Sequence, residues 1–304
     1  MSGAPGPAAP VRYSSRTLGL LLSVAGVVVL SPDALVIRLV DESQWTILFW
    51  RSGLTAIALT LLIGYLARGD VWAWFWAVGR IGIVIGAFHC LGSIMFVTSI
   101  THTSTANTLV IISSGPLFAA LLSKVFLGER IDTRTWVAIV VVVVAVAIVF
   151  SGSLGSGSVG GDAAALGGAL SLAAVFTAIR AARAVSMIPA IVLGTALTAT
   201  VAFLLGAEVP SGPGAGLLFI QGGLMMPAAA ALLATAPRHL PAPEVTLIAR
   251  LEMVLAPLWV WLVLGEAPTV TAAIGGAVIL ATLAVHSYLS LRSRQTVGIG
   301  EPVL

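Results

Sequence analysis

The chain has 304 residues, of which 59% are hydrophobic and only 9% are charged, and its mean hydropathy is +1.08. Soluble globular domains carry about 25% charged residues, so this composition excludes an ordinary soluble fold. The formal net charge of +3 is spread along the chain and does not favour nucleic-acid binding, while the single cysteine, Cys90, excludes an internal disulfide framework and a cysteine-based metal site.

The first residues, 1–16, are rich in Pro, Gly and Ala and are predicted to form a disordered tail. A long apolar run follows Arg16, as it would in a secretory signal. That run continues past the region where cleavage would occur, and Ser31-Pro32-Asp33-Ala34 is a poor cleavage site. The sequence therefore predicts an uncleaved first membrane helix.

Apolar runs of the length that crosses a bilayer, about 20 residues, recur along the whole chain. The alternating ten-residue pattern of a membrane β-barrel is absent from the sequence. We therefore predict an all-α polytopic membrane protein with ten transmembrane helices. Their approximate ranges are 18–40, 44–67, 80–99, 104–127, 134–151, 162–185, 188–206, 214–236, 243–264 and 269–290.

Lys and Arg are distributed unevenly between the two ends of these spans. With both termini in the cytoplasm, cytoplasmic segments hold all of these residues except Arg38, Arg51 and Arg250, which fall within spans. Such an excess of positive charge marks the cytoplasmic side. The sequence predicts a multi-pass protein of the plasma membrane, or of the inner membrane in a bacterium, with both termini cytoplasmic.

One pattern near the end of the fourth span recurs at the end of the ninth. Aligning Gly128-Glu129 with Gly265-Glu266 places Gly115 opposite Glu252. Each unit then holds five spans, an odd number, so the two units cross the membrane in opposite directions. Inverted repeats of this kind are typical of secondary transporters. The predicted organisation is a first repeat at 17–151, a Ser/Gly linker at 152–161, a second repeat at 162–291 and a C-terminal tail at 292–304.

Two motifs in these halves resemble a known group of transporters. The first is Gly-Pro-Leu-Phe-Ala-Ala-Leu-Leu at 115–122, which runs into Leu-Gly-Glu-Arg at 127–130. The second is Leu-Trp-Val-Trp-Leu-Val-Leu-Gly-Glu at 258–266. With ten spans in two halves, they resemble the drug/metabolite transporter superfamily, EamA type, over about residues 17–290.

The resemblance implies a transporter rather than an enzyme. Members of this type mostly export amino acids and related metabolites, including aromatic amino acids and methionine. One departure concerns the proline of the fourth span, because Met253 occupies the position aligned with Pro116 and the nearest proline is Pro257. The bend of the ninth span is therefore expected to differ from that of the fourth.

Glu252 is the main candidate for substrate binding or proton handling. It lies nine positions after Pro243, which at about 1.5 Å per residue is close to the middle of a hydrocarbon core of about 30 Å. A charge at that depth costs about 2.5–3.5 kcal/mol on insertion scales, so it needs a partner. That partner could be a proton, a substrate ammonium group or a structural ion pair. Arg250 lies about 200° away around the helix and is predicted to be structural.

Four further polar side chains are candidates for the same path: His89, Gln221, Ser114 and Asn107. A histidine at mid-depth could relay protons, and an amide could orient a zwitterion. Asn107 and Ser114 precede the Gly115-Pro116 break, which suits a cavity wall. Packing, interhelical hydrogen bonds and satisfaction of a kinked backbone are the structural alternatives for all four.

Asp33 and Arg51 are predicted to lie at the same depth near the outer ends of the first two spans. They could form a structural ion pair, or an outer gate with a carboxylate-binding arginine. Pro32 removes a backbone donor and can bend the first helix, which suits a gate.

The sequence contains no Walker motif, no His-Glu-x-x-His and no Gly-x-Ser-x-Gly, so we predict no cofactor and no metal. The leading hypothesis is a secondary transporter that exports amino acids or related small metabolites by alternating access. Its partners would be a small-molecule substrate and the lipid bilayer. The alternatives are an intramembrane enzyme that uses Glu252 and His89 on lipid-linked groups, and a structural membrane subunit.

Overall fold

The computed structural model describes residues 15–66, 71–129, 132–154, 158–181, 188–236, 239–240, 245, 248–249 and 251–297. Secondary structure within these ranges is helical, which confirms the all-α prediction. The helices are α1 (Ser15–Leu30), α2 (Asp33–Leu39), α3 (Gln44–Leu66), α4 (Val71–Ala77), α5 (Gly79–His102), α6 (Thr105–Ile112), α7 (Gly115–Leu127), α8 (Thr133–Ser153), α9 (Val159–Ala181), α10 (Ile188–Leu204), α11 (Pro213–Ile220), the π-helical turn η1 (Gln221–Met225), α12 (Met226–Thr235), α14 (Glu252–Leu264) and α15 (Val270–Val297).

Seven helical segments in the described part of the chain are long and apolar enough to cross a membrane. They are Arg16–Leu39, Gln44–Tyr65, Gly79–His102, Thr105–Leu127, Thr133–Ser153, Val159–Ala181 and Pro213–Leu233. Three shorter apolar helices, Ile188–Leu204, Glu252–Leu264 and Val270–Val285, fall within the other three predicted spans. The predicted tails are 1–16 and 292–304, but α1 already begins at Ser15 and α15 continues to Val297. Residues 1–14 and 298–304 of these tails, part of the linker, and Arg250 lie outside the described residues.

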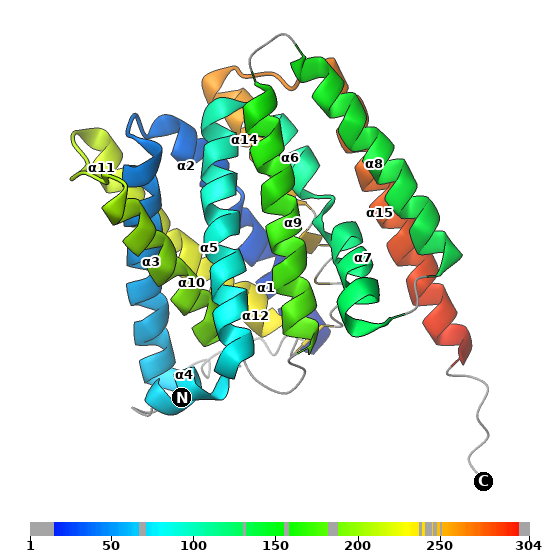
Figure 1. Ribbon diagram of the computed structural model, residues 1–304, viewed down its shortest axis with the longest axis horizontal. Helices are drawn as coiled ribbons and strands as arrows, with labels where there is room; N and C mark the ends of the chain where they lie inside the picture. The colour runs from blue at the N-terminus through cyan, green and yellow to red at the C-terminus, as the bar shows by residue number, and fades with distance from the viewer. Residues whose placement is uncertain are drawn as a thin grey trace, which may run out of the picture.

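The long helices stand side by side in an upright bundle (Figure 1). In its middle, α5 packs against α9 on one side and against α10 on the other, and α10 also packs on α3. Along one flank α8 and α15 lie next to each other. Because α8 precedes the predicted linker and α15 follows it, the two predicted halves share an extensive interface.

Three long apolar segments are interrupted where proline or small polar residues occur. The first breaks at Ser31-Pro32 between α1 and α2, and the fourth breaks at Ser113-Ser114 between α6 and α7. In the eighth, Pro227 cannot donate to the carbonyl four residues earlier, and the wider turn η1 lies directly before it. Turns of this kind are rare and often occur at functional sites.

Helices α7 and α14 are alike in length and in the way they end. Each has 13 residues, and each stops at a glycine in the left-handed conformation, Gly128 with φ 67° and Gly265 with φ 71°. A side chain at either position would be strained. Gly115 and Glu252, which the motif alignment pairs, are the first residues of the two helices.

Close helix packing depends on glycine at two contacts. A Cβ at Gly222 would lie 2.6 Å from the carbonyl oxygen of Arg51, and one at Gly194 would lie 2.8 Å from that of Gly86. Glycine at these positions lets η1 approach the backbone of α3 and lets α10 approach that of α5. The first contact fixes η1 against α3 and the second fixes α10 against α5, and both α3 and α5 contribute residues to the candidate site.

Candidate functional site

A buried polar cluster joins α2, α3 and η1. Arg51 donates to Asp33 through two hydrogen bonds, Nε to Oδ1 at 3.1 Å and Nη2 to Oδ2 at 2.9 Å. Gln221 Nε2 donates to Asp33 Oδ1 at 2.8 Å and to the Asp33 backbone carbonyl at 3.2 Å. The Asp33 and Arg51 side chains are only 6% and 13% exposed. The structure thus contains the ion pair that the sequence predicted, and it adds Gln221.

The local structure of each element explains this geometry. Asp33 is the first residue of α2, where the helix dipole favours a negative charge. Gln221 is the first residue of η1 and is fully buried. Thr55 of α3 connects α3 to η1, because its hydroxyl lies 2.7 Å from the carbonyl of Arg51 and 3.0 Å from that of Gly222.

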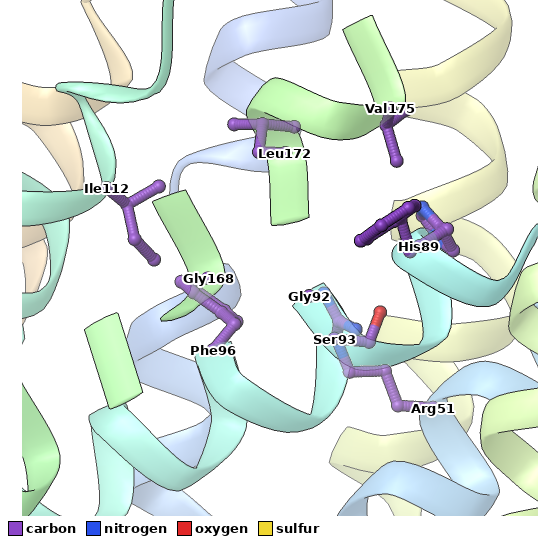
Figure 2. A pocket seen from close by; sticks show the side chains of 10 residues that line it. Arg51, His89, Gly92, Ser93, Phe96, Ile112, Gly168, Leu172 and Val175 are labelled. Atoms are coloured by element: carbon purple, nitrogen blue, oxygen red, sulfur yellow. The ribbon is translucent and has the colours of Figure 1, made fainter. Parts of the chain in front are cut away.

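Arg51 also lines a cavity of about 180 Å³. Figure 2 shows the side chains of α5 and α9 on opposite sides of this cavity. The guanidinium carbon of Arg51 lies 6.0 Å from the centre of the Phe96 ring, within cation–π range. The described residues that line the cavity are Arg51, Phe88, His89, Gly92, Ser93, Phe96, Ile112, Gly168, Leu172 and Val175.

The cavity combines one cation, a few polar groups and a largely apolar wall. Arg51, His89 and Ser93 supply a guanidinium, an imidazole and a hydroxyl. Such a site can orient a small molecule that has an anionic end and an apolar body. Of the residues predicted for substrate binding, His89 lies on this cavity, and Gln221 contacts Asp33, the partner of Arg51.

The other predicted site residues lie elsewhere. The Ser114 hydroxyl donates to the backbone carbonyl of Ile111 at the break between α6 and α7, which is the structural alternative for that residue. Glu252 is partly buried and begins α14, and it is not among the described residues that line the cavity.

Asn107 belongs to a second polar cluster, centred on Asp162. The Asp162 side chain is fully buried at the start of α9 and accepts hydrogen bonds from Thr103 at 2.6 Å, from Asn107 at 3.3 Å and from Ser153. This cluster ties together the ends of α5, α6, α8 and α9. Sequence reasoning missed it, because Asp162 is the first residue of a predicted span and reads as a boundary residue.

Two ion pairs connect the repeated Gly-Glu motifs with arginines of the opposite predicted half. Glu266 pairs with Arg38 of α2 at 3.3 Å, and Glu129 pairs with Arg180 of α9 at 2.9 Å. Arg38 also donates to the backbone carbonyl of Thr103 at 2.5 Å. One pair therefore joins the end of α14 to α2, and the other joins the end of α7 to α9, at opposite ends of the bundle (Figure 1).

The EamA-like transporter family matches residues 17–151. This range is just under half of the chain and runs from within α1 to within α8, and it includes Asp33, Arg51 and His89. The match confirms the resemblance inferred from the motifs of the first half. The first half of the chain is therefore similar to EamA-like transporters, and its long apolar helices fit a membrane protein.

The fold is also shared with solved structures. A structure titled "Crystal structure of protein" superposes with a TM-score of 0.61 at 20% sequence identity, covering 90% of this chain and 98% of that one. At this identity the likeness establishes the fold alone. None of the curated proteins compared with this chain matches it. Within the described residues, no group of three or more His, Cys, Asp or Glu side chains could hold a metal ion.

Proposed function

We propose that this EamA-like protein is a secondary transporter that exports amino acids or related small metabolites by alternating access. The observation that carries the proposal is the cavity beside the Asp33–Arg51 pair. This cavity is lined by α3, α5 and α6 of the first predicted half and by α9 of the second, and secondary transporters bind substrate between their two halves.

The charges beside the cavity support a zwitterionic substrate. Arg51 presents a guanidinium that matches a carboxylate in a forked geometry, and Asp33 lies directly behind it. When a substrate carboxylate accepts one of the Arg51 hydrogen bonds in place of Asp33, Gln221 can still donate to Asp33 and keep its side chain in position. The aromatic rings of Phe88 and Phe96 would then contact the apolar body of the substrate.

We further propose that the ten spans form two inverted five-helix repeats, at 17–151 and 162–291, in the plasma membrane with both termini cytoplasmic. The equal lengths and glycine ends of α7 and α14 support this arrangement. The ion pairs Arg38–Glu266 and Arg180–Glu129 support it as well. In each pair, the glutamate that follows the fourth helix of one predicted repeat contacts an arginine in the first helix of the other repeat. In alternating access, one pair would open while the other stays closed.

The remaining site residues take different roles in this proposal. His89 contributes an imidazole to the cavity wall. Asn107 and Ser114 hold the broken fourth span in shape through Asp162 and the Ile111 carbonyl. Glu252, at the start of α14, is the proposed proton carrier. The competing enzyme hypothesis needs Glu252 beside His89. Of these two residues, only His89 is among the described residues that line the cavity.

Counterflow into proteoliposomes loaded with single amino acids tests this proposal. A Gly168→Leu variant would fill the cavity without a close backbone clash, because a Cβ there meets only Ile112 and Met95 at 3.5–3.8 Å. Gly160→Leu is the matched control on the same helix, where a Cβ meets nothing within 4 Å. We expect exchange to be lost in the first variant and kept in the second. Absence of exchange across a broad amino-acid panel would refute the substrate class. Equal counterflow activity of the two variants would show that the cavity is not the substrate site.

A further inference from the structure

A second hollow, an apolar groove of about 620 Å³, lies between α5, α7 and α9. Its wall includes Phe88, Phe126 and Leu170, which are 38%, 73% and 44% exposed and therefore face the bilayer. The two polar residues in the described wall, Ser171 and Thr177, direct their hydroxyls at helix carbonyls 2.8 Å away. Neither hydroxyl is turned toward the groove, so the groove suits a hydrocarbon occupant.

The groove is long enough to span one leaflet of a membrane. Its lining on α9 runs from Gly167 to Ala181. At about 1.5 Å per residue this distance is about 21 Å, compared with about 15 Å for half of the hydrocarbon core. A complete acyl chain therefore fits along it, with the head group at one end.

Positive charge gathers at one end of this groove. A Cβ at Gly92 would lie 3.3 Å from Ser171, and one at Gly167 would lie 3.1 Å from Met95, so α5 and α9 run antiparallel. This register brings Arg80, at the start of α5, to the same end as Arg180, near the end of α9. Arg80 is exposed, and the Arg180 side chain is 61% exposed although it pairs with Glu129.

We propose that this groove binds the acyl chain of an anionic phospholipid whose phosphate is held by Arg80 and Arg180. Basic residues at the head-group end of a groove between membrane helices are the expected recognition chemistry for such a lipid. Phe88 lines both this groove and the central cavity, so a bound chain would contact the back of the cavity wall. The lipid site does not depend on the proposed transport activity.

The first test fills the groove. Ala174→Phe places a ring among the lining residues of α9, and Ala147→Phe is its control on the exposed face of α8. The purified full-length variants would be titrated with phosphatidylglycerol in mild detergent, and bound lipid would be counted by native mass spectrometry. We expect the first variant to lose the bound lipid and the second to keep it. Equal lipid binding by both variants would overturn the proposal.

The second test concerns the head group and changes two exposed arginines. Arg80→Gln and Arg180→Gln are each expected to weaken phosphatidylglycerol binding about fivefold while leaving phosphatidylcholine binding unchanged. Glu129→Gln is the control, because it breaks the same ion pair but keeps the arginine. If Glu129→Gln weakens lipid binding as much as Arg180→Gln does, the ion pair rather than the phosphate contact is responsible, and the head-group assignment is wrong.

A transport substrate is the competing occupant of the groove. If Ala174→Phe abolishes counterflow but leaves the number of bound phospholipids unchanged, the groove belongs to the substrate path and the lipid proposal fails. If the same variant loses the lipid in a protein that shows no counterflow at all, the lipid site stands without the transport proposal.

Discussion

Replacing Asp33 with alanine is the most informative single change, because it removes the acceptor of three hydrogen bonds. Two come from Arg51 at 3.1 and 2.9 Å, and one comes from Gln221 at 2.8 Å. The Arg51 side chain is 13% exposed, so little water can take the place of the carboxylate. Loss of one partner of a buried pair costs about 3–5 kcal/mol, and we expect the free energy of unfolding to fall by this amount.

A double-mutant cycle measures how much of that cost comes from the stranded cation. Arg51→Met removes the charge and keeps an unbranched apolar side chain. We expect Asp33→Ala combined with Arg51→Met to be more stable than Asp33→Ala alone, because no uncompensated charge remains. Equilibrium unfolding in mixed micelles, followed by tryptophan fluorescence, would give each free energy.

The less buried pair Arg38–Glu266 supplies the control, in which Glu266 also accepts a hydrogen bond from the backbone N–H of Thr105. Its side chains are 26% and 31% exposed, and removal of Glu266 is expected to cost at most about 1 kcal/mol. If Asp33→Ala and Glu266→Ala lower the free energy of unfolding by the same amount, burial does not make the Asp33–Arg51 pair more important for stability. If the loss of unfolding free energy in the double variant equals the sum of the losses in Asp33→Ala and Arg51→Met, the two side chains are not coupled.

Three further stability changes follow from the contacts. Gly222→Ala would place a methyl group 2.6 Å from the Arg51 carbonyl oxygen, and we expect a loss of about 1–3 kcal/mol, seen as a lower unfolding midpoint in detergent. Asp162→Ala would leave three donors without their carboxylate, and a loss of about 3 kcal/mol is expected in the same assay, whereas Asp162→Asn should recover part of it. Trp259→Phe removes the indole hydrogen bond to the Ser31 hydroxyl at 2.9 Å, with an expected cost of about 1 kcal/mol and no change in helix content by circular dichroism.

The sequence located helices and breaks well because their causes are local. A run of apolar residues predicts a span wherever it occurs, and Pro32 and Pro116 interrupt backbone hydrogen bonding in any surroundings. The Asp33–Arg51 pair was also within reach of sequence reasoning, because two opposite charges at equal depth in consecutive spans need each other.

The partners across the bundle were not predictable in the same way. Gln221 reaches Asp33 from a segment far along the chain, and Asp162 collects donors from three other helices. The depth of Glu252 suggested the centre of a cavity, but the cavity is lined instead by residues of α3, α5, α6 and α9. Depth along a helix can be counted in the sequence, whereas the direction in which a side chain points depends on how that helix is rotated.

The sequence by itself determined the class of protein, the positions of most membrane helices, the EamA-like motifs and the charges that need partners. Only the tertiary structure decided which helices surround the cavity and which side chains meet there. The physical reason is that lipid tails and the protein interior are equally apolar, so hydrophobicity places a helix in the membrane without choosing its inner face. That choice depends on close packing at residues such as Gly222 and Gly194 and on a few buried hydrogen bonds, which appear only when the whole bundle is assembled.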